Sequence, residues 1–444
     1  MTRVEPASAP EVQHAVKRIL LRAPKGPFEV CSAEDTLDRN LIAENSGNLV
    51  FIHAAWKLLS APGVEISPDR LVVQPDAADE INEQFDAYVI PLANAFRLQY
   101  QAALVRTTEL VRRLRIPVVV LGVGAQGTVD HGWDAIRPID GAVKDFVSAV
   151  LDRSPTIGVR GEATREYLNG LGFRDVDVIG CPSMFMWGDT IDVERKTAVI
   201  DERSNVAITI SPYRAAMGNV AMAAHGRYPR LTYFAQDLPT LGLLFDGTPL
   251  PGGTPESLLP VHPSHPFFRE HRTRFYVDPW PWIEDLRNFD FSFGTRIHGS
   301  IAALLAGTPA VVLAHDSRTL ELARYFDIPH RLLRDVPPDL DPADLYADAD
   351  FTALHAGHAE RFETFVRYLA RNGLDHVFAH DGAAVDFERR IHDTAYPASV
   401  EQWWPEGGAG TARLAARRLR RQARRAVARL RGGRSGSFAG RRRR

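Results

Sequence analysis

Arg296 and His298 lie on one turn of this 444-residue chain, within the segment FGTRIHGS. An apolar run precedes the turn, and an apolar stretch typical of a helix follows it. The first N–H groups of a helix have no internal partner and lie at the positive end of its dipole, so a phosphate or carboxylate fits there. We predict that this turn binds an anion. The alternative is that Arg296 is a surface cation and His298 an ordinary helix-start histidine.

Two residues after this pair extend the predicted anion site. Gly299 lets the backbone approach a ligand closely, and Ser300 either caps the helix or binds the ligand.

Two further arginines follow apolar runs in the second half of the chain. Arg214 comes after the run 206–210, and Arg318 comes after the run 311–313 with His315 and Asp316. Carboxyl ends of parallel strands meet at one sheet edge, where open α/β sheets bind ligands. Arg214, Arg296, His298 and Arg318 therefore predict a small substrate with several negative charges.

Similar junctions occur in the first half. Arg160 follows the run 156–159 and is suited to a carboxylate or phosphate, although a salt bridge to Glu162 or Asp177 would also explain it. The polar turn Asn45-Ser46-Gly47-Asn48 precedes a predicted helix from 48 to 59. This turn either binds a hydroxylated or anionic ligand or forms an ordinary helix cap.

The segment GVGAQG follows the apolar run 118–121 and places Gln126 where it can hydrogen-bond a ligand. Its spacing is not that of a dinucleotide fingerprint, so it indicates no nucleotide by itself. Cys31 and Cys181 are the only cysteines, which excludes a disulfide framework and a cysteine zinc site. We expect Cys181 to be a buried thiol near the site rather than a nucleophile, and we expect no metal.

Apolar runs that alternate with helical patterns predict an α/β fold with mostly parallel sheets. We expect two Rossmann-like domains, residues 28–190 and 205–335, with a ligand cleft between them. Residues 1–27 are assigned to an N-terminal extension, and residues 336–404 to a helical segment whose helix at 355–369 braces the first domain. The Pro- and Gly-rich stretch 241–268 is predicted to be a long loop or lid.

The chain is 45% hydrophobic and 24% charged, as in ordinary globular proteins. It has no apolar run long enough to span a membrane and no secretory leader, so we expect it in the cytosol. Residues 405–444 contain fourteen arginines and an Ala-rich apolar stripe. This tail predicts a basic amphipathic helix on an anionic membrane surface; a disordered tail or a nucleic-acid contact is the alternative.

The segment GTRIHG, the apolar helix after it and AGTP then resemble the signature of the polysaccharide pyruvyl transferase family. The resemblance extends more weakly through Ser46-Gly47-Asn48, the stretch 157–171 and Gly180–Ser183, over about residues 40–335. It implies a GT-B-like fold and transfer of pyruvate from phosphoenolpyruvate to a sugar as a cyclic ketal. Cys181-Pro182-Ser183 departs from the family pattern, since many members carry an acidic residue there.

The resemblance suggests roles for the residues above. His298 would transfer protons, because an imidazole titrates near neutrality, and Arg296 would stabilise the departing phosphate. Arg160, Arg214, Arg318, Gly299 and Ser300 would bind the donor, while Asn45, Ser46, Gly47, Asn48 and Gln126 would face the acceptor. We expect no cofactor besides phosphoenolpyruvate as co-substrate, a glycan or glycolipid acceptor, and no nucleic acid.

Two other functions remain open from the sequence. One is a GT-B glycosyltransferase that uses a nucleotide sugar, in which Glu321 would reach the ribose. The other is a non-catalytic partner in polysaccharide assembly that keeps the fold without turnover.

Overall fold

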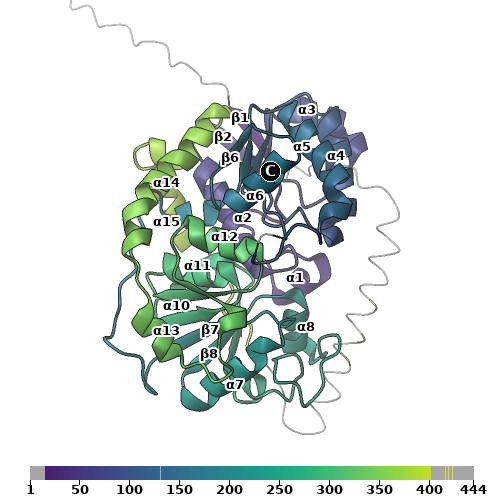
Figure 1. Ribbon diagram of the computed structural model, residues 1–444. Coiled ribbons are helices and arrows are strands. Elements are labelled where there is room, and N and C mark those ends of the chain that lie inside the picture. Colours follow the sequence, from purple (N-terminus) through teal and green to yellow (C-terminus); the bar gives the residue numbers. More distant parts are fainter. Residues whose placement is uncertain (1–15, 131, 402–415, 417–418, 420–422, 424–444) are drawn as a thin grey trace, which may run out of the picture.

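Two parallel sheets, each flanked by helices, lie one above the other in Figure 1. The computed structural model describes residues 16–130 and 132–401, together with positions 416, 419 and 423. The predicted α/β architecture of two Rossmann-like domains is confirmed.

The first domain contains a sheet with strand order β2-β1-β3-β4, and β5 and β6 form a parallel pair beside it. An isolated parallel bridge from Val123 to Val159 joins that pair to the end of β4. The strands are β1 (Lys17–Leu21), β2 (Val64–Pro68), β3 (Ala87–Pro91), β4 (Val118–Leu121), β5 (Ile157–Val159) and β6 (Val176–Val178). The helices are α1 (Ala33–Arg39), α2 (Ser46–Leu59), α3 (Ala78–Gln84), α4 (Gln101–Arg113), α5 (Asp140–Leu151) and α6 (Glu162–Gly170).

The first domain begins earlier than the sequence suggested. β1 is an inner strand that pairs with β2 on one side and β3 on the other. The part of the predicted 1–27 extension from Lys17 onward therefore belongs to the first domain. β1 is a five-residue run with two basic residues, and such a short segment becomes a strand only through the neighbours that cover it.

The second domain has a sheet with strand order β12-β11-β10-β7-β8-β9. Its strands are β7 (Val206–Thr209), β8 (Leu231–Ala235), β9 (Thr273–Phe275), β10 (Phe291–Gly294), β11 (Ala310–Ala314) and β12 (His330–Leu332). Its helices are α7 (Ala216–Arg227), α8 (Leu238–Asp246), α9 (Pro266–Arg269), α10 (Pro279–Leu286), α11 (Ile297–Leu305) and α12 (Ser317–Tyr325). The predicted loop 241–268 is thus partly helical at both ends and consists mainly of turns and bends from 247 to 265.

Helix α2 lies between the domains. Every residue of α2 except Asn48 is buried, and the helix contacts both α10 and α11 of the second domain. A helix that is apolar on all sides is stable only when it is covered on all sides. α2 therefore joins one face of the first sheet to the second domain in one continuous hydrophobic cluster, while the other face of the first sheet packs in a separate cluster.

The C-terminal segment consists of α13 (Pro342–Asp348), α14 (Thr352–Arg371) and α15 (Ala383–His392). α14 runs from the second domain up along the first, as Figure 1 shows. Its end is tied to the first domain by the Tyr368 hydroxyl, which donates to the Val120 carbonyl at 2.6 Å, and by the Arg371–Asp177 ion pair. The predicted return of this helix to the first domain is confirmed.

Among the described residues, the helices are too short or too polar to cross a membrane. The predicted basic tail at 405–444 lies outside the described residues, apart from three isolated positions.

One ion pair across the domain interface is fully buried. Lys25 follows β1, Asp278 precedes α10, and neither side chain is exposed. Burial raises the pKa of the Asp278 carboxyl to about 6, against the effect of the Lys25 ammonium, which lowers it. Removing one partner of such a pair leaves an isolated charge in the interior.

We predict that Asp278→Asn lowers the free energy of unfolding by about 3–5 kcal/mol, because the Lys25 ammonium then has no counter-charge. Urea unfolding measures the change. The double variant Lys25→Met with Asp278→Leu should recover most of it, because no buried charge remains. The control is Asp79→Asn, which removes an exposed pair with Arg115 and should have little effect. Equal effects of Asp278→Asn and Asp79→Asn would contradict the prediction.

Candidate functional site

The strand order of each sheet reverses direction once, and the two reversal points are where ligands bind in open α/β sheets. In the second sheet the reversal lies between β7 and β10, and in the first it lies between β1 and β3. Ser211–Arg214 follow β7, and Thr295–His298 follow β10. The predicted anion turn thus lies at the reversal point of the second sheet.

Helix α11 begins at this point, with Arg296 as its N-cap residue. The N–H groups of Gly299 and Ser300 donate to the Arg296 carbonyl at 2.9 and 3.1 Å. Gly299 packs against Gln236 and Thr209 so closely that an added Cβ would lie 2.5–2.6 Å from their side chains. Ser300 is fully buried, and its hydroxyl has no partner among the described residues. The Gly299 and Ser300 side-chain positions therefore face the protein interior.

Two of the predicted arginines form ion pairs within the second domain. Arg296 pairs with Asp237, and Arg318 pairs with Asp316. Both still carry a buried Nε atom that has no partner among the described residues. The charge of Arg318 and that of His315 hold the pKa of the Asp316 carboxyl well below its usual range.

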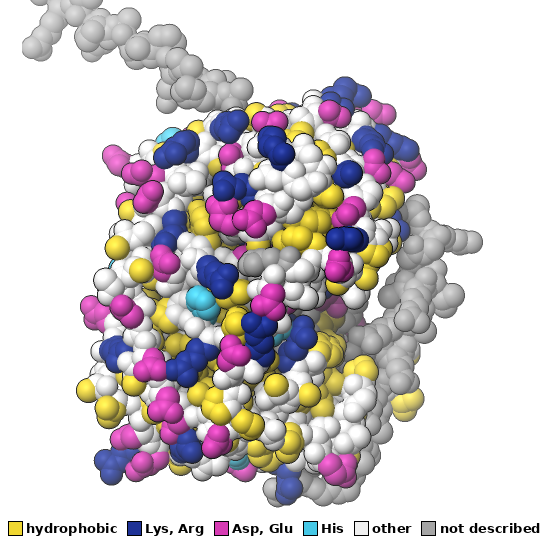
Figure 2. All heavy atoms as spheres, in the orientation of Figure 1, with side chains coloured by type: hydrophobic (Ala, Val, Ile, Leu, Met, Phe, Trp, Pro, Cys, Tyr) yellow, Lys and Arg dark blue, Asp and Glu magenta, His cyan; other side chains and the backbone are white. Residues whose placement is uncertain are grey.

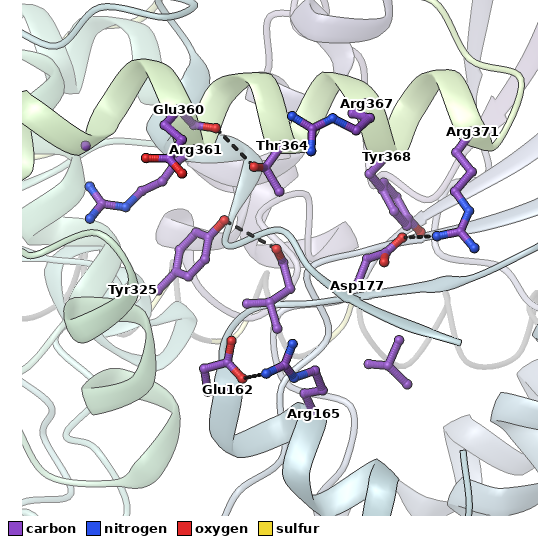
Figure 3. A pocket seen from close by; sticks show the side chains of 13 residues that line it. Glu162, Arg165, Asp177, Tyr325, Glu360, Arg361, Thr364, Arg367, Tyr368 and Arg371 are labelled. Atoms are coloured by element: carbon purple, nitrogen blue, oxygen red, sulfur yellow. Dashed lines mark hydrogen bonds and ion pairs between the residues drawn. The ribbon is translucent and has the colours of Figure 1, made fainter. Parts of the chain in front are cut away.

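Two other arginines form no ion pair in the described part of the chain. Arg160 is buried, and its guanidinium donates to the Gly122 carbonyl at 3.3 and 3.4 Å. The salt bridges considered for it do not form, since Glu162 pairs with Arg165 and Asp177 with Arg371 (Figure 3). Arg214 is half-buried and forms no ion pair within the same described ranges.

The charges of these arginines converge on two histidines. Burial is the main cause that lowers the pKa of His298 to about 3, and Arg160, Arg318 and Arg296 lower it further. Burial likewise lowers the pKa of His315 to about 4. Asp316 raises this pKa, whereas Arg214, Arg318 and Arg296 lower it further. The structure therefore brings Arg160 of the first domain together with the predicted cluster of the second. Figure 2 shows Lys and Arg side chains at the level where the domains meet.

The N-termini of α2 and α11 face each other across the domain interface. A Cβ added to Gly47 would lie 2.9 Å from the His298 Cβ and 2.8 Å from Asn45 Oδ1. Asn45 caps α2 through Gly47 N at 2.8 Å and donates to Asp237 at 3.1 Å, while Ser46 N donates to the Gln236 carbonyl at 3.0 Å. Two positive helix ends and several arginines thus surround His298, a setting that favours an anion.

The predicted acceptor residues divide into two groups. Asn45, Ser46 and Gly47 are engaged in the contact with the second domain, although the buried Ser46 hydroxyl has no described partner. Asn48 lines an open cleft of about 270 Å³. Gln126 is half-buried in the turn after β4, next to Gly127, whose N–H donates to Ser317 Oγ at 2.8 Å.

Two side chains lie against His298, and neither of these contacts was predicted from the sequence. The Phe51 ring stacks on the imidazole with centroids 5.5 Å apart, and Cys181 Sγ lies 3.6 Å from His298 Nε2. Cys181 is a buried thiol as expected, and burial raises its pKa. Cys181 Sγ accepts from Ser183 Oγ at 3.0 Å in its own domain and meets His298 from the other domain.

Glu321, considered as a ribose ligand, is committed to the interface between the domains. It is buried and accepts hydrogen bonds from Thr164 N at 3.0 Å and Thr164 Oγ1 at 2.8 Å. Burial raises its pKa to about 7. This arrangement does not leave Glu321 free to bind a nucleotide.

Several hollows are larger than the cleft that Asn48 lines, and their linings do not include His298. One of about 630 Å³ is bordered by α6, β6, α12 and α14, and several of its charged side chains pair with each other (Figure 3). Another, of about 860 Å³, includes Trp187, Trp280 and Tyr396. Across residues 16–130 and 132–401, His, Cys, Asp and Glu side chains form no group suited to a metal ion.

We predict that protonation of His298 opposes folding at acid pH. The folded-state pKa is about 3, whereas an unfolded histidine titrates near 6.5, so the unfolded chain binds the proton first as the pH falls. Wild type should lose about 2 kcal/mol more stability between pH 7 and pH 5 than His298→Gln, which cannot titrate. Urea unfolding at both pH values measures this difference. A constant difference between the two proteins would contradict the prediction.

Comparisons with known proteins agree with the motif at β10–α11. The sequence profile described as polysaccharide pyruvyl transferase matches residues 45–317. No curated protein matches the chain.

Similar solved structures include a putative UDP-N-acetylglucosamine 2-epimerase from Listeria monocytogenes, which is 11% identical in sequence. The match covers 87% of this chain and 99% of the epimerase chain, with a TM-score of 0.39. The UDP-GlcNAc 2-epimerase from Methanocaldococcus jannaschii is 10% identical, with coverages of 80% and 99% and a TM-score of 0.39. HepE from Anabaena is 14% identical, with coverages of 85% and 99% and a TM-score of 0.36.

Proposed function

Since the chain belongs to the polysaccharide pyruvyl transferase family, we propose that it transfers pyruvate from phosphoenolpyruvate to a sugar of a polysaccharide, glycolipid or lipid-linked glycan. The product is a cyclic pyruvate ketal. Membership of the family makes the chain a transferase; donor, product and site residues are parts of the proposal.

One observation carries the assignment of the donor site: arginines without ion-pair partners converge on His298. Arg160 and Arg214 form no ion pair in the described ranges, although Glu321 acts on Arg160 at longer range, and the charge of Arg160 lowers the pKa of His298. Phosphoenolpyruvate carries both a carboxylate and a phosphate, which suit arginine forks. Arg160 and Arg214 would bind these groups, with Arg318 beside them.

Arg296 has a different part in the proposal. Asp237 holds its guanidinium at the start of α11, so the cation is oriented before a substrate arrives. Arg296 and the helix N-terminus would stabilise negative charge on the departing phosphate.

The proposed reaction forms two C–O bonds and breaks one. Two sugar hydroxyls attack the central carbon of phosphoenolpyruvate, the methylene gains a proton to become a methyl group, and the bond to the phosphate oxygen breaks. The two hydroxyl protons balance this change, because one goes to the methylene and the other leaves with phosphate.

His298 is suited to move the first of these protons. Its lowered pKa keeps the imidazole neutral at pH 7, so it accepts a hydroxyl proton and then donates it to the methylene. The charges on a bound donor would offset the surrounding arginines and raise its pKa. Cys181, at 3.6 Å from Nε2, helps to orient the ring.

We predict that phosphoenolpyruvate binds the wild type in calorimetry and that Arg160→Gln or Arg214→Gln weakens binding about 10- to 100-fold, through loss of a charge-assisted hydrogen bond. His298→Gln should bind the donor yet release no phosphate in the presence of p-nitrophenyl glycosides. The control is Arg112→Gln, an exposed residue of α4 that pairs with Asp145. Binding of UDP-glucose in place of phosphoenolpyruvate would overturn the proposal.

The proposed place of action is the inner face of a membrane, reached through the basic tail at 405–444. Fourteen arginines would attract anionic lipids. Deletion of residues 410–444 should abolish sedimentation with phosphatidylglycerol-containing liposomes. Unchanged sedimentation would show that the tail is not a membrane anchor, and phosphatidylcholine liposomes are the control.

A further inference from the structure

A cleft of about 270 Å³ lies at the reversal point of the first sheet. Arg22 follows β1 there, and the segment from Leu92 to Arg97 follows β3. Its polar lining consists of Arg22, Asn40, Glu44, Asn48, Asn94 and Arg97. The cleft is smaller than the pockets of roughly 300–1,000 Å³ that hold drug-sized ligands, so it suits one sugar ring.

The cleft opens beside the proposed catalytic histidine. Phe51 lines it and stacks on the His298 ring. Asn48, also in its lining, follows Gly47, where an added Cβ would lie only 2.9 Å from the His298 Cβ. A sugar in this cleft would therefore lie on the first-domain side of His298, with the donor arginines Arg160 and Arg214 outside its lining.

Two buried polar atoms in the cleft lack partners. Asn94 Oδ1 and Arg97 Nε have no hydrogen-bond partner among the described residues, and Arg97 forms no ion pair there. Arg22 differs, since it pairs with Asp69 and donates to the Tyr100 hydroxyl at 3.2 Å. Burial lowers the pKa of Arg97, and the nearby Arg318 lowers it further. Tyr100 and Glu44, in the same lining, raise the pKa of Arg97, but no described carboxylate forms an ion pair with it.

The wall opposite these residues is strained and held in place. Asn40, Ala43 and Glu44 have left-handed backbones, with φ of 53°, 51° and 72°. Asn40 bonds Glu44 through both its amide atoms, at 2.7 Å each, and Asn48 Nδ2 donates to the Ala43 carbonyl at 2.6 Å. Strained non-glycine backbone that its surroundings hold in place is typical of binding sites.

We propose that this cleft is the acceptor site and that the accepted sugar carries an anionic group, a carboxylate or a phosphate, which pairs with Arg97. The inference rests on the proposed function and adds the class of the acceptor to it. Asn48, Asn94 and Glu44 then bind hydroxyls of the sugar, and its two reacting hydroxyls point past Phe51 toward the donor beside His298.

The test compares binding of glucuronate, glucose 6-phosphate and glucose by calorimetry, with and without phosphoenolpyruvate present. Wild type should bind at least one anionic sugar about 10-fold or more tightly than glucose, and Arg97→Gln should remove that preference. The better of the two anionic probes identifies the group as a carboxylate or a phosphate. Arg106→Gln, an exposed arginine on α4, is the control and should keep the preference.

Phosphoenolpyruvate binding to the same variants separates this inference from the proposed function. Arg97→Gln should bind phosphoenolpyruvate as the wild type does. Equal loss of donor and sugar binding would place Arg97 in the donor site and overturn the inference. It would also be overturned if wild type bound no sugar under either condition, or bound glucose as tightly as the anionic sugars. Failure of wild type to bind phosphoenolpyruvate would instead overturn the proposed function.

Discussion

The close approach of two helix N-termini, those of α2 and α11, is the constraint on which the site depends. It is possible only because residue 47 has no side chain to collide with His298. Asp237 supplies negative charge at the junction by pairing with Arg296 and accepting from Asn45, which links the domains. Without this negative charge, the two positive helix ends would repel each other.

This junction explains why His298 is neutral. The ring is buried between Phe51 and Cys181, and three guanidinium groups lie near enough to disfavour its protonation. An imidazole in such a place is neutral at pH 7 but a weak base, and a bound anion would strengthen it by raising its pKa. The same surplus of positive charge that lowers the pKa of His298 also attracts an anionic substrate, so binding and proton transfer are coupled through one electrostatic field.

The two reversal points give the proposed donor and acceptor adjoining sites that meet at His298, where the sugar hydroxyls reach the donor. Arg214 and Arg296 follow strands of the second sheet, whereas Arg97 follows a strand of the first. Buried α2 fixes the distance between the sheets, and the Lys25–Asp278 pair and the Glu321–Thr164 bonds join the same domains elsewhere. The domain contacts therefore position the chemistry as well as stabilise the fold.

The sequence by itself determined the α/β class, most strands and the residues around Arg296 and His298, because buried parallel strands are apolar runs and their carboxyl ends carry the functional turns. It did not reveal β1, whose strand character depends on β2 and β3 beside it. Only the tertiary structure decided that Asn45–Gly47 join the domains, that Cys181 lies beside His298, and that Arg97 forms no ion pair with a described residue. The physical reason is that pairing, burial and electrostatic coupling depend on distances in space, whereas these partners are far apart in the sequence.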